Sequence, residues 1–231
     1  MRIGKDVMSS AEIKVRVWDV STRLFHWLMF ILLGGLWLTA EQGEMQWHQV
    51  LAYCLLILIS FRLLWGFVGS DTAKFKAFVV PPSQALNYLT TTPKPQSIGH
   101  NPLGGYMVLL MLTVLLTQLV TGLFSTDEIF TEGPLFYLVD ESVALGLTWL
   151  HKTNFNVLLG CVAVHILAVL FHWFKGENLI KPMFTGDKVL SVEHAPVSTP
   201  KMKSGVIALI IVAAFALPVW LYLLKPVLDY I

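Results

Sequence analysis

Residues 148–174, TWLHKTNFNVLLGCVAVHILAVLFHWF, form an apolar run that carries His151 and His165 fourteen residues apart. A helix that crosses a bilayer needs about 20 mostly apolar residues, so this run is long enough to span a membrane. At about 100° and 1.5 Å per residue, the two histidines share one helical face and lie about 21 Å apart. We therefore expect one histidine near each surface of the membrane.

Four further apolar runs accompany this one, at residues 24–40, 47–68, 102–124 and 205–224. The 231 residues are 55% hydrophobic and only 13% charged, whereas an average soluble domain is about 25% charged. Lipid offers no hydrogen bonds to the backbone, so the runs are predicted to be helices. The predicted fold is an all-α membrane protein, with a four-helix transmembrane bundle and a fifth, C-terminal transmembrane helix.

The runs also suggest how the chain is divided. Residues 1–186 are predicted to form the transmembrane domain. Residues 187–204, which contain Pro196 and Pro200, have the composition of a cytoplasmic linker. Residues 205–231 are predicted to be the C-terminal transmembrane helix and a short tail.

The connections between the runs alternate in charge. Basic residues outnumber acidic ones in segments 1–23, 69–100 and 175–203, whereas the charged residues of 41–46 and 125–147 are all acidic. Loops rich in Lys and Arg stay in the cytoplasm, so the N-terminus is predicted to be cytoplasmic and the C-terminus periplasmic. A net charge of +1 gives no reason to expect a nucleic-acid partner.

Histidines are concentrated in the membrane segments. An ionisable residue at membrane depth costs about 2.5–3.5 kcal/mol, so each is a functional hypothesis by default. His194 lies in the linker. The other six of the seven lie in or at the ends of the apolar runs: His26, His48, His100, His151, His165 and His172.

Matching the depths of these residues predicts two pairs. His26 lies toward the cytoplasmic end of its run, as His165 does, and His48 begins the second run at the opposite surface, near His151. The expected pairs are therefore His26 with His165 and His48 with His151. His172 shares a face with His165 and is the alternative cytoplasmic-side partner.

Two imidazoles from facing helices at each of two levels favour haem as the cofactor, with one iron held between each pair. The chain has no CxxCH motif, so two non-covalent haem b groups are predicted. A zinc or copper site is the competing interpretation, but it needs three or four ligands with thiolate or carboxylate help. A proton relay is the other, and it normally uses intramembrane Asp or Glu, which the runs lack.

Four further residues are candidates for the cofactor sites. Arg62, fourteen residues after His48, either pairs with a haem propionate or extends to the cytoplasmic interface. Arg23 is a second propionate candidate. His100 and Asn101 begin the third run, where they form either a helix cap or a site for a quinone head group.

Several short motifs occur in order along the chain: VWDVSTRLFHW at 17–27, FRLLWGFVG at 61–69, GHNPLG at 99–104, and ENLI and FTG within 177–186. Over about residues 15–188 the chain resembles the bacterial b-type cytochromes typified by the cytochrome b subunit of nickel–iron hydrogenase. The resemblance implies a four-helix di-haem core in the inner membrane, with quinone exchange at one haem and a redox partner at the other. The family's ligand positions fall on His26, His48, His151 and His165.

The predicted function is electron transfer across the bacterial inner membrane, between the quinone pool of a respiratory chain and a periplasmic c-type cytochrome or catalytic subunit. Besides quinone and membrane lipid, a second copy of the chain remains open as a partner. The acidic segment before His151 and the fifth run depart from the family pattern, so no hydrogenase partner is inferred. The alternatives are a stand-alone quinone-reducing oxidoreductase, such as a superoxide oxidase, and a non-redox membrane anchor.

Overall fold

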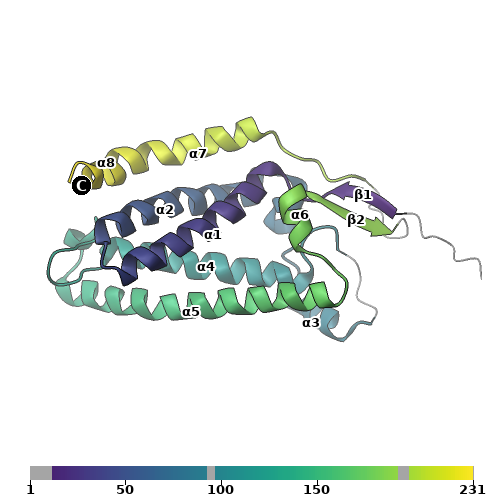
Figure 1. The fold of residues 1–231 in the computed structure, drawn as a ribbon, viewed down its shortest axis with the longest axis horizontal. Helices are drawn as coiled ribbons and strands as arrows, with labels where there is room; N and C mark the ends of the chain where they lie inside the picture. The colour runs from purple at the N-terminus through teal and green to yellow at the C-terminus, as the bar shows by residue number, and fades with distance from the viewer. Residues whose placement is uncertain (1–11, 93–96, 192–197, 231) are drawn as a thin grey trace, which may run out of the picture.

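The computed structural model describes residues 12–92, 97–191 and 198–230, and within them five helical segments are long and apolar enough to cross a membrane (Figure 1). The predicted all-α membrane fold is confirmed. The five segments are α1 (Val20–Glu41), α2 (Met45–Val68), α4 (Pro102–Phe124), α5 (Glu141–Phe174) and Gly205–Leu228, which comprises α7 (Gly205–Val219), a π-helical turn (Trp220–Leu224) and α8 (Lys225–Leu228).

Short elements join these helices at their ends. They are β1 (Glu12–Arg16), two 3-10 turns (Asp71–Ala73 and Phe75–Ala77), α3 (Pro82–Thr90), a third 3-10 turn (Phe136–Leu138), α6 (Ile180–Thr185) and β2 (Asp187–Ser191).

Side-chain caps fix where two of the long helices begin. The carboxylate of Asp19 accepts a hydrogen bond from the backbone N–H of Thr22 at the start of α1, at 2.7 Å. The amide oxygen of Asn101 accepts from the backbone N–H of Gly104 at the start of α4, also at 2.7 Å. Both caps satisfy backbone donors that have no partner within the helix.

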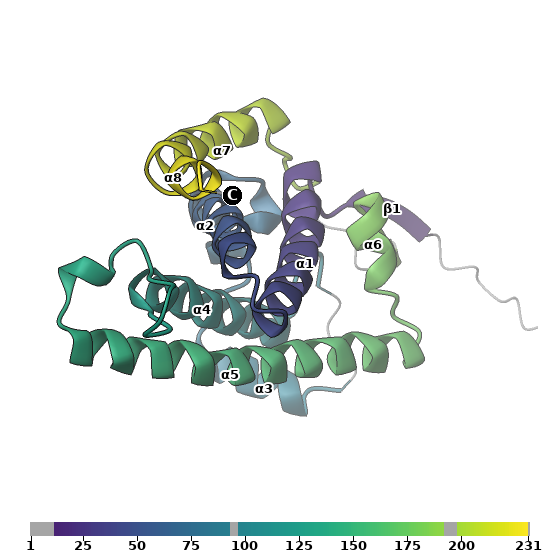
Figure 2. The ribbon, with the colours of Figure 1, turned by 60° about the vertical axis from the view of Figure 1, so that its left-hand side comes forward.

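The bundle consists of two helix pairs. α1 packs against α2, α4 packs against α5, and the pairs meet where α2 contacts α4, whereas α1 and α5 make almost no close approach (Figure 2). The core lies along α2 and α4, and its most enclosed side chains include Leu55, Ile59, Trp65, Leu115 and Leu158.

The C-terminal span is part of this packing. α7 lies along α2, and its residues Ala208 and Ile211 are buried in the same hydrophobic core (Figure 1). Sequence alone separated this helix from the bundle by a linker, whereas in the structure it covers the side of α2 that faces away from α4 and α5 (Figure 2).

α5 is longer than the predicted span of 148–174. It has 34 residues and begins at Glu141, which makes it about 51 Å long, against about 30 Å for the hydrocarbon core. Asp140 at the N-cap and Glu141 in the first turn complement the positive end of the helix dipole. Apolarity marks where a helix leaves lipid, not where it ends, so the sequence could not give the true start.

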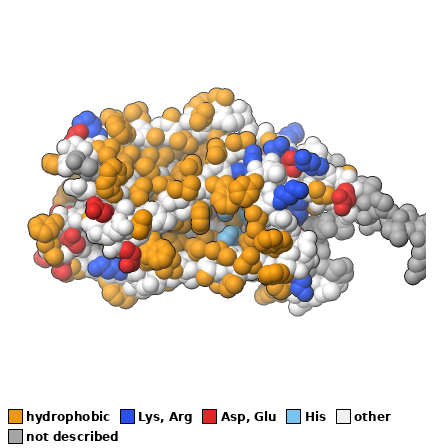
Figure 3. Space-filling model, in the orientation of Figure 1, with side chains coloured by type: hydrophobic (Ala, Val, Ile, Leu, Met, Phe, Trp, Pro, Cys, Tyr) orange, Lys and Arg blue, Asp and Glu red, His pale blue; other side chains and the backbone are white. Residues whose placement is uncertain are grey.

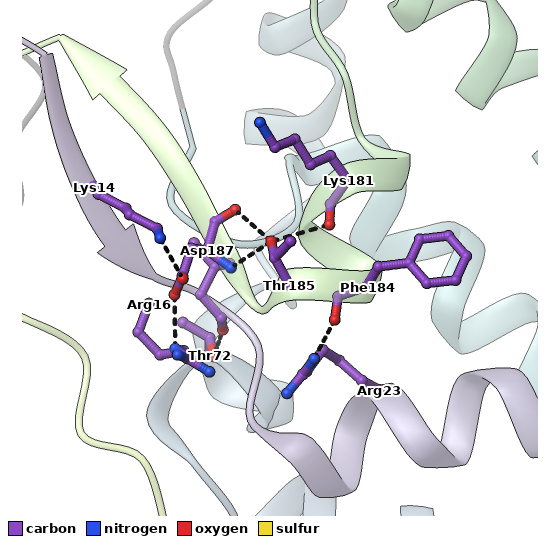
Figure 4. Close-up of polar contacts among 9 residues, drawn as sticks. Lys14, Arg16, Arg23, Thr72, Lys181, Phe184, Thr185 and Asp187 are labelled. Atoms are coloured by element: carbon purple, nitrogen blue, oxygen red, sulfur yellow. Dashed lines mark hydrogen bonds and ion pairs between the residues drawn. The ribbon is translucent and has the colours of Figure 1, made fainter.

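The predicted linker 187–204 begins with a strand. β2 pairs antiparallel with β1, and Asp187 forms ion pairs with Arg16 at 2.7 Å and with Lys14 at 3.2 Å (Figure 4). The N-terminal segment is thereby tied to the segment that follows α6.

Backbone hydrogen bonds join the segment that enters α1 to the segment that leaves α6. The N–H groups of Val17 and Trp18 donate to the carbonyl of Gly186 at 2.8 and 3.0 Å. Gly186 has φ +86°, and a Cβ there would lie 2.7 Å from the carbonyl oxygen of Trp18. Only glycine fits this position without strain. Arg23, in the first turn of α1, donates to the carbonyl of Phe184 in α6 (Figure 4).

The two ends of the bundle differ in charge, as the sequence predicts. Lys and Arg gather at the end formed by β1, β2, α3 and α6, which we call the basic end (Figure 3). Asp and Glu gather at the other end, formed by residues 41–44 and 125–141, which we call the acidic end.

Candidate functional site

Two histidines from different helix pairs face each other near the basic end. The ring centroids of His26 on α1 and His165 on α5 are 6.4 Å apart, with 53° between the ring planes. Both side chains are half-buried. The structure therefore brings together the two residues that sequence spacing paired.

A second pair lies toward the acidic end. The ring centroids of His48 on α2 and His151 on α5 are 6.5 Å apart, with 77° between the planes. Both pairs bridge the two halves of the bundle and share α5 as one wall. Four imidazoles thus stand at two levels between helices that are held apart.

These separations fit two imidazoles on one metal ion. A metal–imidazole bond is about 2 Å long, and the ring nitrogen lies about 1 Å from the ring centroid, so axial ligands of one iron have centroids about 6 Å apart. Figure 3 shows histidine side chains inside a hollow on the hydrophobic face of the bundle. An apolar, flat macrocycle with two axial imidazoles suits that environment.

His48 and His151, which we call the acidic-end pair (His26 and His165 being the basic-end pair), are also held in the tautomer that metal binding needs. His48 Nδ1 lies 3.0 Å from the carbonyl oxygen of Leu36, and His151 Nδ1 lies 2.9 Å from that of Gln118. A carbonyl only accepts, so each Nδ1 carries the proton and each Nε2 keeps its lone pair. Metal-binding histidines usually have such a partner on the other ring nitrogen.

A polar network in the bilayer region adjoins His151, and sequence reasoning missed it. The side chain of Asn154 donates to Gln118 Oε1 at 2.7 Å and to the Val114 carbonyl at 3.0 Å. The amide nitrogen of Gln118 lies 3.1 Å from His151 Nε2 and must turn away for that nitrogen to bind iron. The sequence signal that could have revealed this network is the presence of two amide residues, Gln118 and Asn154, inside apolar runs.

The basic end carries a set of buried polar nitrogens without hydrogen-bond partners. Among the described residues, four buried side-chain nitrogens lack a hydrogen-bond partner: Arg23 Nε, His26 Nδ1, Arg62 Nη1 and His100 Nδ1. Buried polar groups are normally paired. The two guanidinium nitrogens of this set are the donors that the acidic propionates of a haem would satisfy.

Arg62 is the most telling member of this cluster. Its side chain is only 3% exposed and lies over the ring of Phe75, with the guanidinium carbon 5.2 Å from the ring centroid. No ion pair within 4 Å reaches it from the part of the chain that the structure describes. Sequence analysis allowed Arg62 either to extend to the cytoplasmic interface or to pair with a haem propionate. The side chain is buried, so it does not extend to the interface.

His100 lies beside the basic-end pair. Its ring packs between Trp18 and Phe78, at centroid distances of 4.7 and 4.8 Å. Burial, followed by the positive charge of Arg62, lowers the pKa of His100 to about 3. The ring is therefore neutral at physiological pH, with an unpartnered Nδ1.

The other candidates have structural partners. Asn101 caps α4, and Tyr88 hydrogen-bonds to it. His172 Nδ1 forms a hydrogen bond with Glu177 Oε2 at 2.8 Å, and His172 does not face His26. His194 lies outside the described residues. Within the described ranges, no group of three or more His, Cys, Asp or Glu side chains is placed to hold a metal ion.

Comparison with known proteins places the chain in a family. The sequence model of the family described as prokaryotic cytochrome b561 matches residues 17–186. That match begins and ends at the residues joined by the Val17–Gly186 backbone hydrogen bond. Comparisons with curated proteins and with solved structures found no match.

Proposed function

The chain belongs to the prokaryotic cytochrome b561 family, whose members are membrane b-type cytochromes that transfer electrons, and we propose that this member carries electrons between a quinone and a periplasmic redox protein. His26 with His165, and His48 with His151, would each hold one haem b. When bound, the two haems supply reversible one-electron chemistry at the two levels of the bundle.

The observation that carries this proposal is the pair of facing imidazoles at each level, 6.4 and 6.5 Å apart. Two imidazoles on one haem iron would leave no position for oxygen or substrate, which suits electron transfer. Arg62 and Arg23 hold the propionates at the basic end, because their buried nitrogens lack other partners.

The basic end lies in the cytoplasm, following the rule that Lys- and Arg-rich loops are retained there. α1 then runs outward from a cytoplasmic N-terminus, and α7 carries the C-terminus to the periplasm. The location that we propose is the bacterial inner membrane.

Quinone binds at the basic end, close to His26 and His165. The neutral His100 ring, with its free Nδ1, supports this site because it offers a hydrogen bond to a quinone carbonyl. Asn101 at the start of α4 is the neighbouring candidate, although its amide oxygen is used as a helix cap.

The redox partner docks at the acidic end. Glu128 and Glu132 lie beside the exposed side chains of Ile129 and Phe130, which are 74% and 95% accessible, and the exposed Asp140 belongs to the same end. Such a surface attracts a basic protein and offers it an apolar contact. A c-type cytochrome or a basic catalytic subunit has that character.

The test uses full-length protein reconstituted in vesicles that contain a quinol, with the b-type absorption band followed in time. We expect the quinol to reduce the haems and a basic c-type cytochrome outside to reoxidise them. Steady quinone reduction by superoxide, with no protein partner, would instead establish a stand-alone oxidoreductase. Protein expressed with ample haem that shows no reduced b-type band would establish a non-redox anchor.

A further inference from the structure

A cluster of titratable side chains at the basic end lies outside the histidine pairs. The Glu177 carboxylate, in the segment that follows α5, accepts hydrogen bonds from His172 Nδ1 and from Lys188 Nζ, each at 2.8 Å. Lys188 also donates to the carbonyl oxygen of Ser97 at 3.2 Å. The cluster thereby ties the end of α5 and the strand β2 to the segment that leads into α4.

Tyr88 of α3 connects this cluster to the proposed quinone site. Its side chain forms a hydrogen bond with that of Asn101. The amide oxygen of Asn101 already caps α4, so its amide nitrogen is the donor and the Tyr88 oxygen is the acceptor. Burial, followed by the negative charge of Glu177, raises the pKa of Tyr88 despite that hydrogen bond, so the carboxylate lies close to the phenol. A line of polar groups thus runs from Glu177 through Tyr88 to Asn101.

Water reaches one end of this line and not the other. The side chain of Glu177 is 42% exposed and that of its neighbour His172 is 26% exposed, whereas Nδ1 of His100, next to Asn101, is buried. In the proposed orientation the exposed end of the line faces the cytoplasm. Protons from cytoplasmic water can therefore enter at Glu177.

The side chains around the proposed quinone site supply no proton themselves. Burial, followed by the positive charge of Arg62, lowers the pKa of His100 to about 3, so the ring holds no extra proton at physiological pH. The amide of Asn101 does not ionise, and a guanidinium does not deprotonate in proteins. A quinone that is reduced beside these groups takes up two protons, which have to come from elsewhere.

We propose that Glu177 and Tyr88 form a proton relay between the cytoplasmic water and a quinone bound beside Asn101. The inference rests on the proposed quinone site at the basic end. Tyr88 donates its hydroxyl proton to the reduced quinone and regains a proton from Glu177, which takes it from water. Hydrogen bonds from Lys188 and His172 hold the Glu177 carboxylate in place for this exchange.

The relay balances for a two-electron reaction. One quinone gains two electrons, one at a time, from the haem of the basic-end pair, and two protons through the relay, which gives one quinol. For each proton, one O–H bond of Tyr88 breaks and re-forms, and Glu177 gains and loses one proton. The oxidation of quinol runs the same steps in reverse, with the protons released to the water.

Stopped-flow reaction of the full-length, two-haem protein with a short-chain benzoquinol tests the relay. Tyr88→Phe and Glu177→Gln should each slow haem reduction on the order of 100-fold, the lower end of what a positioned proton transfer contributes. The reduced-minus-oxidised spectrum and the quinol concentration at half-maximal rate should stay as in the wild type. The controls are Tyr106→Phe, whose hydroxyl donates to the Val80 carbonyl at 2.8 Å, and Glu12→Gln, an exposed carboxylate of the same end. Both should keep the wild-type rate.

Two further readouts separate proton transfer from a structural role. Formate, a small carboxylate that carries protons, should restore part of the rate lost in Glu177→Gln, because that position is open to water. The solvent deuterium isotope effect should rise in both variants, because proton transfer becomes rate-limiting. An unchanged rate in either relay variant, or a loss of rate that neither formate nor deuterium affects, would overturn the relay alone. Wild-type haems that the quinol does not reduce would instead refute the proposed function.

Discussion

His26 on α1 and His165 on α5 face each other with their ring centroids 6.4 Å apart, although their helices make almost no close approach. Their positions are therefore set indirectly, by the packing of α1 on α2 and of α5 on α4. At the basic end, hydrogen bonds from Val17 and Trp18 to Gly186 hold the entry of α1 beside the segment that follows α5. The separation of α1 from α5 is a product of how each pair is built.

Gly122 on α4 gives the His151 ring its room. A Cβ at this position would lie 3.0 Å from Cε1 and 3.3 Å from Nδ1 of that ring. Gly122→Ala should therefore displace the ring and reduce occupancy or shift the spectrum of the acidic-end haem alone. The helix itself should gain up to about 1 kcal/mol from the substitution, so folding is retained.

Electron paramagnetic resonance of the oxidised protein, with a haem count, measures this effect. The control is Gly160→Ala on α5, where nothing lies within 4 Å of the added Cβ. If Gly122→Ala leaves both haem signals as they are in Gly160→Ala, the ring is not held as described.

The backbone closure at Gly186 should contribute to stability. Gly186→Ala combines the cost of a positive φ, about 1–2 kcal/mol, with a contact of 2.7 Å to the Trp18 carbonyl. Gly176→Ala is the matched control, because φ there is +87° but nothing lies within 4 Å. Thermal unfolding in detergent should show the larger loss of Tm for Gly186→Ala, and equal losses would argue against the closure.

An ionic cluster at the basic end should make stability depend on pH. Partial burial opposes ionisation of Glu177, but its hydrogen bonds and charge contacts with Lys188 and His172 outweigh this, so its pKa lies below the ordinary value. Because the folded state favours the carboxylate, its contribution is present at neutral pH and is lost as the pH falls below about 4.

Thermal unfolding of the wild type and of Glu177→Gln between pH 3 and pH 7 checks this linkage. The wild type should be the more stable at pH 7, and the difference should shrink as the acid limit is approached. A difference that does not change with pH would show that Glu177 acts by packing alone.

The acidic end should control encounter with the partner. Replacing Glu128 and Glu132 with Gln should slow electron exchange with a basic c-type cytochrome at low ionic strength and weaken its salt dependence. Stopped-flow rates over a range of salt concentrations measure this effect. Glu12→Gln, which changes an exposed carboxylate of the basic end, is the control. Equal slowing by this change would show that the partner does not dock specifically at the acidic end.

The membrane spans and the histidine pairs were predictable because each depends on one-dimensional spacing. Fourteen residues place His151 and His165 on one face at two depths, and loop charge assigns a partner to each. Other features depend on contacts that spacing does not encode. β1 and β2 are five residues each and lie far apart in sequence. The hydrogen-bond partners of His48 Nδ1 and His151 Nδ1 are backbone carbonyls, which any residue could supply.

Arg62 shows why a single position is harder to predict than a pattern. Its place near the end of an apolar run favours a side chain that reaches water slightly over one turned into the bundle. Packing against Phe75 decides for the buried position. The sequence named both placements, and the one it slightly favoured is not the one observed.

The most direct test of the account is a haem count on the wild type and on two ligand variants, with reduced-minus-oxidised spectra of each. We expect two haems per wild-type chain, and one haem per chain in His26→Ala and in His48→Ala, with a different spectral component missing in each. Two haems remaining in either variant, or the same component lost in both, would contradict the pairing of His26 with His165 and of His48 with His151.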